Sequence, residues 1–209
     1  MNSFASFLAL GCLAAIPALA QPRFTGYVGG GPAVPLNTIG SRLDTGWNVS
    51  AGAGVTGRFV GINLNFMYND YGINQAALSQ VGAPDGSTRV WGFTLDPVVH
   101  LTPHAEGPVD FYITGGGGIY HRTVEFTQPA IATITVFDPW WGIAYPANVL
   151  TNQVIGSYGV YKGGVDGGAG FNFRLGQSHA KLFAEARFHH MFTRGVDTNL
   201  LPVTIGIRW

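Results

Sequence analysis

The stretch FAEARFHHMF, residues 183–192, carries the side-chain types that enzymes use for acid–base chemistry. Glu185, Arg187 and His189 follow one another at intervals of two residues, and His190 adds a second imidazole. Imidazole, carboxylate and a hydroxyl nucleophile together can catalyse acyl transfer. The same spacing also places three of these side chains on one face of a β-strand. The stretch is therefore either an active site or a strand whose two faces meet different environments.

The hydroxyl that an acyl-transfer site requires is missing from the expected place. Such a site combines His with Ser and an acidic residue, and in a His-x-Ser pattern the hydroxyl follows two residues after the imidazole. Two residues beyond His189 and His190 stand Met191 and Phe192, and Thr193 is a poorer nucleophile. We therefore predict that the chain is not an enzyme and has no catalytic residue, and that these histidines are interfacial or belong to an ion-pair network.

Metal, cofactor and nucleic-acid sites are also not predicted. The only HxxxH spacing, His100 to His104, passes through Pro103 into a turn, without the helix that would bring both rings to one face. The glycine run at 114–120 lacks the Lys-Ser/Thr ending of a phosphate-binding loop. Eleven basic and eleven acidic residues cancel, so no basic footprint for nucleic acid is present.

The N-terminus has the pattern of a secretory signal peptide. Residues 4–16 are almost wholly apolar, and Pro17 and the small residues of ALA follow them. We predict cleavage after Ala20, which divides the chain into a signal peptide, residues 1–20, and one domain, residues 21–209. Because the apolar run is shorter than about 18 residues, an N-terminal membrane anchor is the weaker alternative. Cys12 lies inside this signal, so the mature domain contains no disulfide.

The rest of the chain shows alternation with a period of two. Charged residues are only 11%, against about 25% in soluble domains, and the chain has 31 glycines. In LPVTIGIRW, residues 201–209, apolar side chains alternate with Thr204, Gly206 and Arg208. Segments of this kind, each long enough to cross a bilayer as a tilted strand, are predicted at 24–34, 47–57, 59–71, 88–101, 109–125, 156–175, 180–193 and 200–209.

The connections between these segments alternate between long and short. Long ones lie at 35–46, 72–87 and 126–155, and short ones lie at 57–58, 102–108 and 176–179. Outer-membrane barrels have tight periplasmic turns and longer outside loops. Backbone groups that are unpaired in lipid cost several kcal/mol, so a membrane sheet must close. The fold class predicted is an all-β, eight-stranded antiparallel up-and-down transmembrane β-barrel with both termini in the periplasm.

Eight strands enclose an interior just wide enough for side chains, so inward charges must pair. We expect Glu185 to lie opposite Arg208 across the 194–199 connection, and His100 to lie beside Asp110 across the 102–108 turn. Glycines at 164, 168 and 170 should leave space for long side chains of neighbouring strands. The predicted interior charge network comprises Glu185, Arg187, Arg208, Asp166, Lys162, Arg174, His100 and Asp110.

The chain resembles the OmpA-like and OmpW-like superfamily of small outer-membrane β-barrel domains. The residues that carry the resemblance are the signal, the glycine- and aromatic-rich strands, FAEARFHH and the terminal VTIGIRW. The family most often ends in Phe; Trp209 differs but keeps the aromatic ring, so the resemblance implies that Trp209 is the assembly signal. It also implies that the partners are outer-membrane lipid including lipopolysaccharide, the barrel-assembly machinery and periplasmic chaperones. We expect no peptidoglycan-binding domain of the kind that follows the barrel in full-length OmpA.

The connection at 126–155 is far longer than a hairpin requires and is unusually apolar. One hypothesis makes its aromatic residues a binding surface for partners or lipids. The other extends strands five and six through 130–137 and 149–155, with the tryptophans in the interface belt. We favour the strand interpretation for these two stretches and leave the tip open. The surface-loop aromatics are Phe137, Trp140, Trp141 and Tyr145.

The leading functional hypothesis is a non-enzymatic, monomeric outer-membrane barrel that acts through its surface loops or stabilises the envelope. The alternative is a narrow channel or conduit for small apolar compounds of the OmpW type. A lipid A-modifying barrel enzyme and a secreted soluble β-sandwich rank below both. Inward charges that pair across the lumen favour the first hypothesis over the channel.

Overall fold

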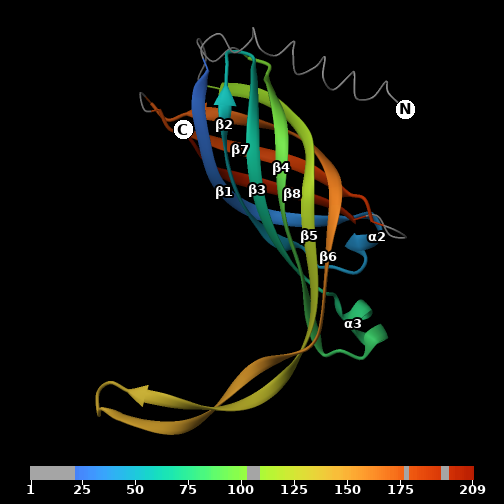
Figure 1. Cartoon of the computed structure of the whole chain (residues 1–209), viewed down its shortest axis with the longest axis vertical. Coiled ribbons are helices and arrows are strands. Elements are labelled where there is room, and N and C mark those ends of the chain that lie inside the picture. The colour runs from blue at the N-terminus through green and yellow to red at the C-terminus, as the bar shows by residue number, and fades with distance from the viewer. Residues whose placement is uncertain (1–21, 103–108, 177–178, 194–197) are drawn as a thin grey trace.

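The computed structural model describes residues 22–102, 109–176, 179–193 and 198–209. The signal peptide predicted for residues 1–20 lies outside these residues, and so does His104. The strands form one closed antiparallel barrel in chain order, as predicted (Figure 1). They are β1 (Arg23–Leu36), β2 (Gly46–Thr56), β3 (Val60–Gly72), β4 (Asp85–His100), β5 (Val109–Asp138), β6 (Ile143–Arg174), β7 (Lys181–Met191) and β8 (Thr198–Arg208).

The alternation predicted from the sequence is present in the barrel wall. In β7, Phe183, Glu185, Arg187, His189 and Met191 are buried, whereas the residues between them are half-buried or exposed. The outer surface presents a band of large apolar side chains that are exposed in the isolated chain, which suits contact with hydrocarbon chains. Members of this band include Val28, Leu64, Leu95, Ile113, Ile119, Phe171, Leu182, Ile205 and Ile207.

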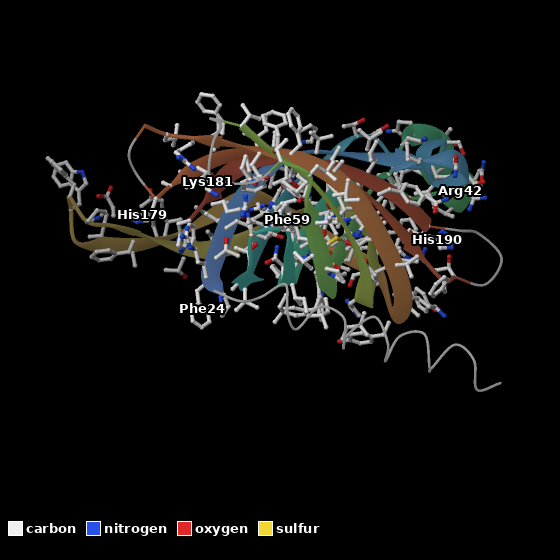
Figure 2. All side chains as sticks on the ribbon, turned by 90° about the horizontal axis from the view of Figure 1, so that it is seen from above. Phe24, Arg42, Phe59, His179, Lys181 and His190 are labelled. Atoms are coloured by element: carbon white, nitrogen blue, oxygen red, sulfur yellow. The ribbon has the colours of Figure 1, made fainter. Side chains whose placement is uncertain are left out.

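The two ends of the barrel differ. Helices α2 (Asn37–Gly40) and α3 (Gln75–Val81) lie at the end opposite the C-terminus (Figure 1). Figure 2 shows Arg42 and His190 toward one end, and Phe24 and Lys181 toward the other. We call the end with α2 and α3 the outer mouth. Within the described residues, no helix has the length and hydrophobicity needed to span a membrane.

Both helices lie in connections for which the sequence predicted only length. Asn74 caps α3 by accepting a hydrogen bond from the Ala77 amide at 2.9 Å. Gly82 ends the helix at a φ of 68°, a left-handed conformation that glycine adopts without strain. The α3 helix covers part of the outer mouth by placing Leu78 in a buried position.

Strands β5 and β6 continue far beyond the barrel, so the predicted extension of these strands is confirmed. Twelve residue pairs, from Thr127 with Val154 to Asp138 with Ile143, form a two-stranded hairpin about 40 Å long. The pairing shifts between Phe126 and Thr127, where the facing strand has one extra residue. A bulge of this kind bends a strand and increases its twist. Figure 1 shows the hairpin (yellow to orange) leaving the barrel and bending sideways.

An aromatic group marks the outer part of the barrel wall. The Trp91 ring lies 5.2 Å from His121 and 5.9 Å from Tyr161, and the His121 and Tyr161 rings are 4.3 Å apart. Closer to the outer mouth, Arg89 forms an ion pair with Glu125 at 3.1 Å on the outer surface. Aromatic rings at the interface and charges beyond it are typical of membrane barrels.

Candidate functional site

Arg187 is the centre of the charges inside the barrel. Its guanidinium contacts Glu185 on the same strand at 2.7 Å and Asp166 on β6 at 3.1 Å, and it also forms an ion pair with Asp96 on β4. All four side chains are buried. Because Arg187 forms ion pairs with carboxylates on three different strands, its contacts link opposite parts of the barrel wall. We call these four residues the Arg187 cluster.

Tyr112 and Arg208 extend this cluster toward the C-terminal end of the barrel. The Tyr112 hydroxyl donates to Glu185 at 2.8 Å and accepts from Arg208 at 3.2 Å. The Arg208 guanidinium is 3.9 Å from Glu185, a long ion pair. It also lies 4.6–5.1 Å from the ring centres of Tyr112, Tyr27 and Phe183. The Arg208 guanidinium is therefore surrounded largely by aromatic rings, on which it stacks.

The predicted register between the last two strands is wrong by four residues. Glu185 lies opposite Thr204, and Arg208 lies opposite Lys181. A slip by an even number of residues leaves every side chain on its own face, so alternation alone does not detect it. Arg208 still reaches Glu185 because its long side chain runs along the barrel interior.

A second group of polar side chains lies nearer the short turns. His100 and Asp110 are 2.9 Å apart, Asn172 donates to Asp110 at 2.8 Å, and Thr56 lies 3.1 Å from the other His100 nitrogen. Hydroxyl, imidazole and carboxylate thus follow the order of a catalytic triad. The neighbouring cavity measures about 30 Å³, enough for one water molecule and too small for an acyl chain. We therefore interpret this group as structural.

The remaining predicted network residues lie away from Arg187. Lys162 faces inward and is half-buried, and it has no ion pair with any residue that the structure describes. Arg174 is exposed at the end of β6, next to the short turn. Neither Lys162 nor Arg174 therefore belongs to the Arg187 cluster.

Asp96 is buried on the inward face of β4 and was not part of the predicted network. It forms an ion pair with Arg187 and accepts hydrogen bonds from Thr94, at 2.9 Å, and from Asn65. Tyr112 and Asn172 are further partners that the sequence analysis missed. The alternation of the sequence indicates that these side chains face inward. It does not indicate how far along the barrel axis each of them lies, and therefore which of them meet.

The predicted glycines do leave space for side chains of neighbouring strands. A β-carbon added to Gly170 would lie 2.6 Å from the Tyr112 hydroxyl, and one added to Gly164 would lie 2.9 Å from the Tyr120 ring. At Gly168 an added β-carbon would be 2.9 Å from the Arg187 backbone. These positions allow the two tyrosines and Arg187 to cross the interior.

An apolar layer separates the Arg187 cluster from the outer mouth. Tyr120 bonds His189 at 3.1 Å, and above them Met67, Val90, Met191 and Leu200 are buried together. The barrel interior is therefore filled by polar contacts in its middle and by apolar packing above. In the residues that the structure describes, no three His, Cys, Asp or Glu side chains converge as a metal site would require.

The surface-loop aromatics lie on the hairpin and its turn. Trp140 and Trp141 are in the turn, where Asp138 accepts hydrogen bonds from both backbone amides, at 2.8 and 3.3 Å. Their side chains are 89% and 76% exposed. Phe137 and Tyr145 are exposed on the adjoining strand ends. Because this turn is at the far end of the hairpin in Figure 1, the tryptophans are not part of the aromatic group on the barrel wall.

Trp209 completes the seam between β1 and β8. Its backbone amide donates to Gly26 at 2.9 Å, and the Gly26 amide donates back to Trp209 at 3.0 Å. The ring covers Gly26 and is exposed on the outer surface. The terminal aromatic residue is thus held in the closing pair of strands.

No protein-family model matches the chain, and no curated protein matches it significantly. Solved structures do resemble it. Neisserial surface protein A (NspA) superposes with a TM-score of 0.58 at 11% identity, over 90% of this chain and 97% of that protein. A major outer membrane protein from Thermus thermophilus gives 0.55 at 12% identity, over 90% and 98%. With the closed ring of eight strands, these likenesses show that the chain has the fold of the small outer-membrane β-barrels.

Proposed function

We propose that this chain is a non-enzymatic outer-membrane protein that acts at the cell surface through its β5–β6 hairpin. In this proposal both termini are periplasmic, and the hairpin stands outside the membrane. Lipid including lipopolysaccharide surrounds the apolar band, and the barrel-assembly machinery binds the strand that ends in Trp209. The outer-membrane fold and the position of the long connections at one end support this orientation.

The observation that carries the proposal is the composition of the hairpin. Between Phe126 and Tyr161 the only charged residue is Asp138. Ile131, Leu150 and Trp140 are 72%, 83% and 89% exposed. Contiguous exposed apolar surface marks a site of contact with protein or membrane. Exposure of these apolar side chains to water is unfavourable, so we infer that another surface covers them.

The hairpin is also suited to contact by its shape. Its backbone is paired residue by residue up to the turn, so little ordering is required when a partner binds. Beyond the barrel both of its long edges lie outside the ring, which leaves backbone groups available for an added strand.

The interior favours this function over the conduit of small apolar compounds. A conduit requires a continuous path, whereas the Arg187 cluster and the apolar layer above it occupy the lumen of the described barrel. We therefore assign the interior to stabilising the barrel that carries the hairpin.

The proposal is tested by removing the hairpin alone. Residues 127–155 are replaced by an Asn-Gly turn, which joins Phe126 to Gly156 in a two-residue hairpin. Cells that display the intact protein should self-aggregate and partition into hexadecane more than cells that display the short form. A Trp140→Ser, Trp141→Ser protein should fall between them. Equal behaviour of all three, at equal surface levels, would contradict the proposal.

Conductance measurements separate the two hypotheses directly. Purified protein in planar lipid bilayers should show no steady channel, with the intact and the short form alike. A stable single-channel conductance of the intact protein would favour the conduit instead.

A further inference from the structure

We propose that the outer mouth is a binding site for a small amphipathic carboxylate such as a medium-chain fatty acid. A cavity of about 320 Å³ lies between α2, α3 and the inward faces of β4, β5 and β8. Small-molecule sites are commonly about 300–1,000 Å³ and mostly apolar. This site concerns the mouth of the barrel and goes beyond the function proposed for the hairpin.

The cavity has an apolar body. Leu43 and Ile39 line it from the α2 side, and Val90, Val124 and Leu200 line it from the barrel wall. The buried Val90 and Leu200 also belong to the apolar layer above the Arg187 cluster. An alkyl chain would therefore meet apolar atoms on both sides and a closed floor beneath, so the site would hold a ligand without passing it through the barrel.

The charges that line the cavity all have the same sign. Arg42 and Arg122 contribute to the lining, and no Asp or Glu among the described residues does. This differs from the middle of the barrel, where Arg187 contacts three carboxylates. Two guanidinium groups without an acidic neighbour in the lining favour an anionic ligand and disfavour a cationic one.

Arg122 supplies the most specific observation. Its Nη1 donates to Thr198 at 3.3 Å, but its Nε is buried and has no hydrogen-bond partner in the described chain. A buried donor that lacks a partner costs free energy, and a turn of the Arg122 side chain toward the cavity would let a carboxylate accept from it. A carboxylate can accept from two guanidinium N–H groups at once. Thr88 and Gln80 are further polar groups of the lining.

Octanoate is the probe for this site, with octanol and octylammonium as ligands of equal chain length. Binding is measured by titration calorimetry on the full chain in zwitterionic nanodiscs, with protein-free nanodiscs subtracted. We expect saturable binding of octanoate and none of octylammonium. Arg122→Gln should weaken octanoate binding by at least roughly tenfold, the loss of one charged hydrogen bond. Arg58→Gln, in the short turn at the other end, should leave it unchanged.

A second variant keeps the test decisive if Arg122→Gln does not fold. Ala77 lines the cavity from α3, outside the barrel wall, so Ala77→Trp should fill the cavity while leaving the ring of strands intact. Octanoate binding should then be lost. The proposal is overturned if the intact protein does not bind octanoate, if octanol binds as tightly, or if folded Ala77→Trp binds octanoate as the unmodified chain does.

Discussion

The interior of the barrel and the external hairpin use the same strands, β5 and β6, in opposite ways. Inside the barrel, charged side chains gather and form ion pairs, with Arg187 between three carboxylates. Outside it, the hairpin presents apolar side chains and carries one charge, Asp138. A soluble protein would have the reverse arrangement. The difference indicates that the paired charges that stabilise the barrel lie inside it, while its outer surface and the hairpin present apolar side chains.

The two regions should therefore differ in what their mutations change. Substitutions in the interior should lower the free energy of unfolding, whereas substitutions in the hairpin should alter contact with other surfaces and leave the barrel stable. The predictions that follow test this division, in order of decreasing effect.

Arg187→Met should have the largest effect on stability. It leaves Glu185, Asp96 and Asp166 buried without the cation that pairs them. Removing one partner of a buried ion pair typically costs about 3–5 kcal/mol, and here three partners remain. Urea unfolding in detergent, followed by tryptophan fluorescence, measures this cost. Arg58→Met, at an exposed turn, is the matched control. If Arg187→Met has the same unfolding free energy as the unmodified chain, the Arg187 cluster does not contribute to stability.

Two double-mutant cycles should rank the partners of Glu185. Glu185→Gln combined with Arg187→Met should show a coupling of roughly 2–3 kcal/mol. Glu185→Gln combined with Arg208→Met should show a coupling of about 1 kcal/mol or less. The Arg208 guanidinium is 3.9 Å from Glu185 and also stacks on aromatic rings. Unfolding free energies of the single and double mutants give both values. A larger coupling with Arg208 would reverse the ranking that the distances predict.

Asp110→Asn should have an intermediate effect. Asp110 accepts hydrogen bonds from His100 and Asn172, and hydrogen bonds to charged groups contribute about 1.5–3 kcal/mol each. We expect the unfolding free energy to fall by about that amount, as measured by urea titration. Asp85→Asn, which removes an exposed carboxylate at the start of β4, is the matched control and should change little. Equal effects of the two substitutions would argue against a structural role for Asp110.

Trp140→Ser combined with Trp141→Ser should have the smallest effect on stability. Both rings are exposed at the end of the hairpin, and surface substitutions usually change stability by less than about 0.5 kcal/mol each. The unfolding midpoint of the barrel should stay the same while adhesion to hydrocarbon decreases. A large loss of stability would mean that the hairpin folds back onto the barrel.

The alternation of the sequence was sufficient to predict the number, the order and the faces of the strands. It could do so because lipid outside and polar contacts inside impose opposite demands on neighbouring residues. It placed Glu185 and Arg187 inside for the same reason. The extension of β5 and β6 was also predicted, because 130–137 and 149–155 have strand composition.

Register and height along the barrel could not be predicted in this way. The four-residue error between β7 and β8 preserved every face, so no alternation was broken. Which inward side chains meet depends on how far each strand is staggered around the ring, a property of the whole barrel. Asp96 and Arg187 meet across that stagger, and nothing local in either strand indicates it. The α3 helix was predictable in principle, since Asn74 and Gly82 are typical of its two ends.

The seam between β1 and β8, with Trp209 bonded to Gly26, has a consequence for the order of events during folding. Every other pair of neighbouring strands is joined by a single connection, but this seam unites the first and the last strand of the ring. Contacts between distant parts of a chain form late, because a long loop must close before they are gained. Until β8 arrives, the growing sheet keeps two open edges, and Arg208 has not yet reached Tyr112 and Glu185. Closure and completion of the interior network are thus expected as one concerted last step, and a chain stalled before it would be open to pairing with other chains.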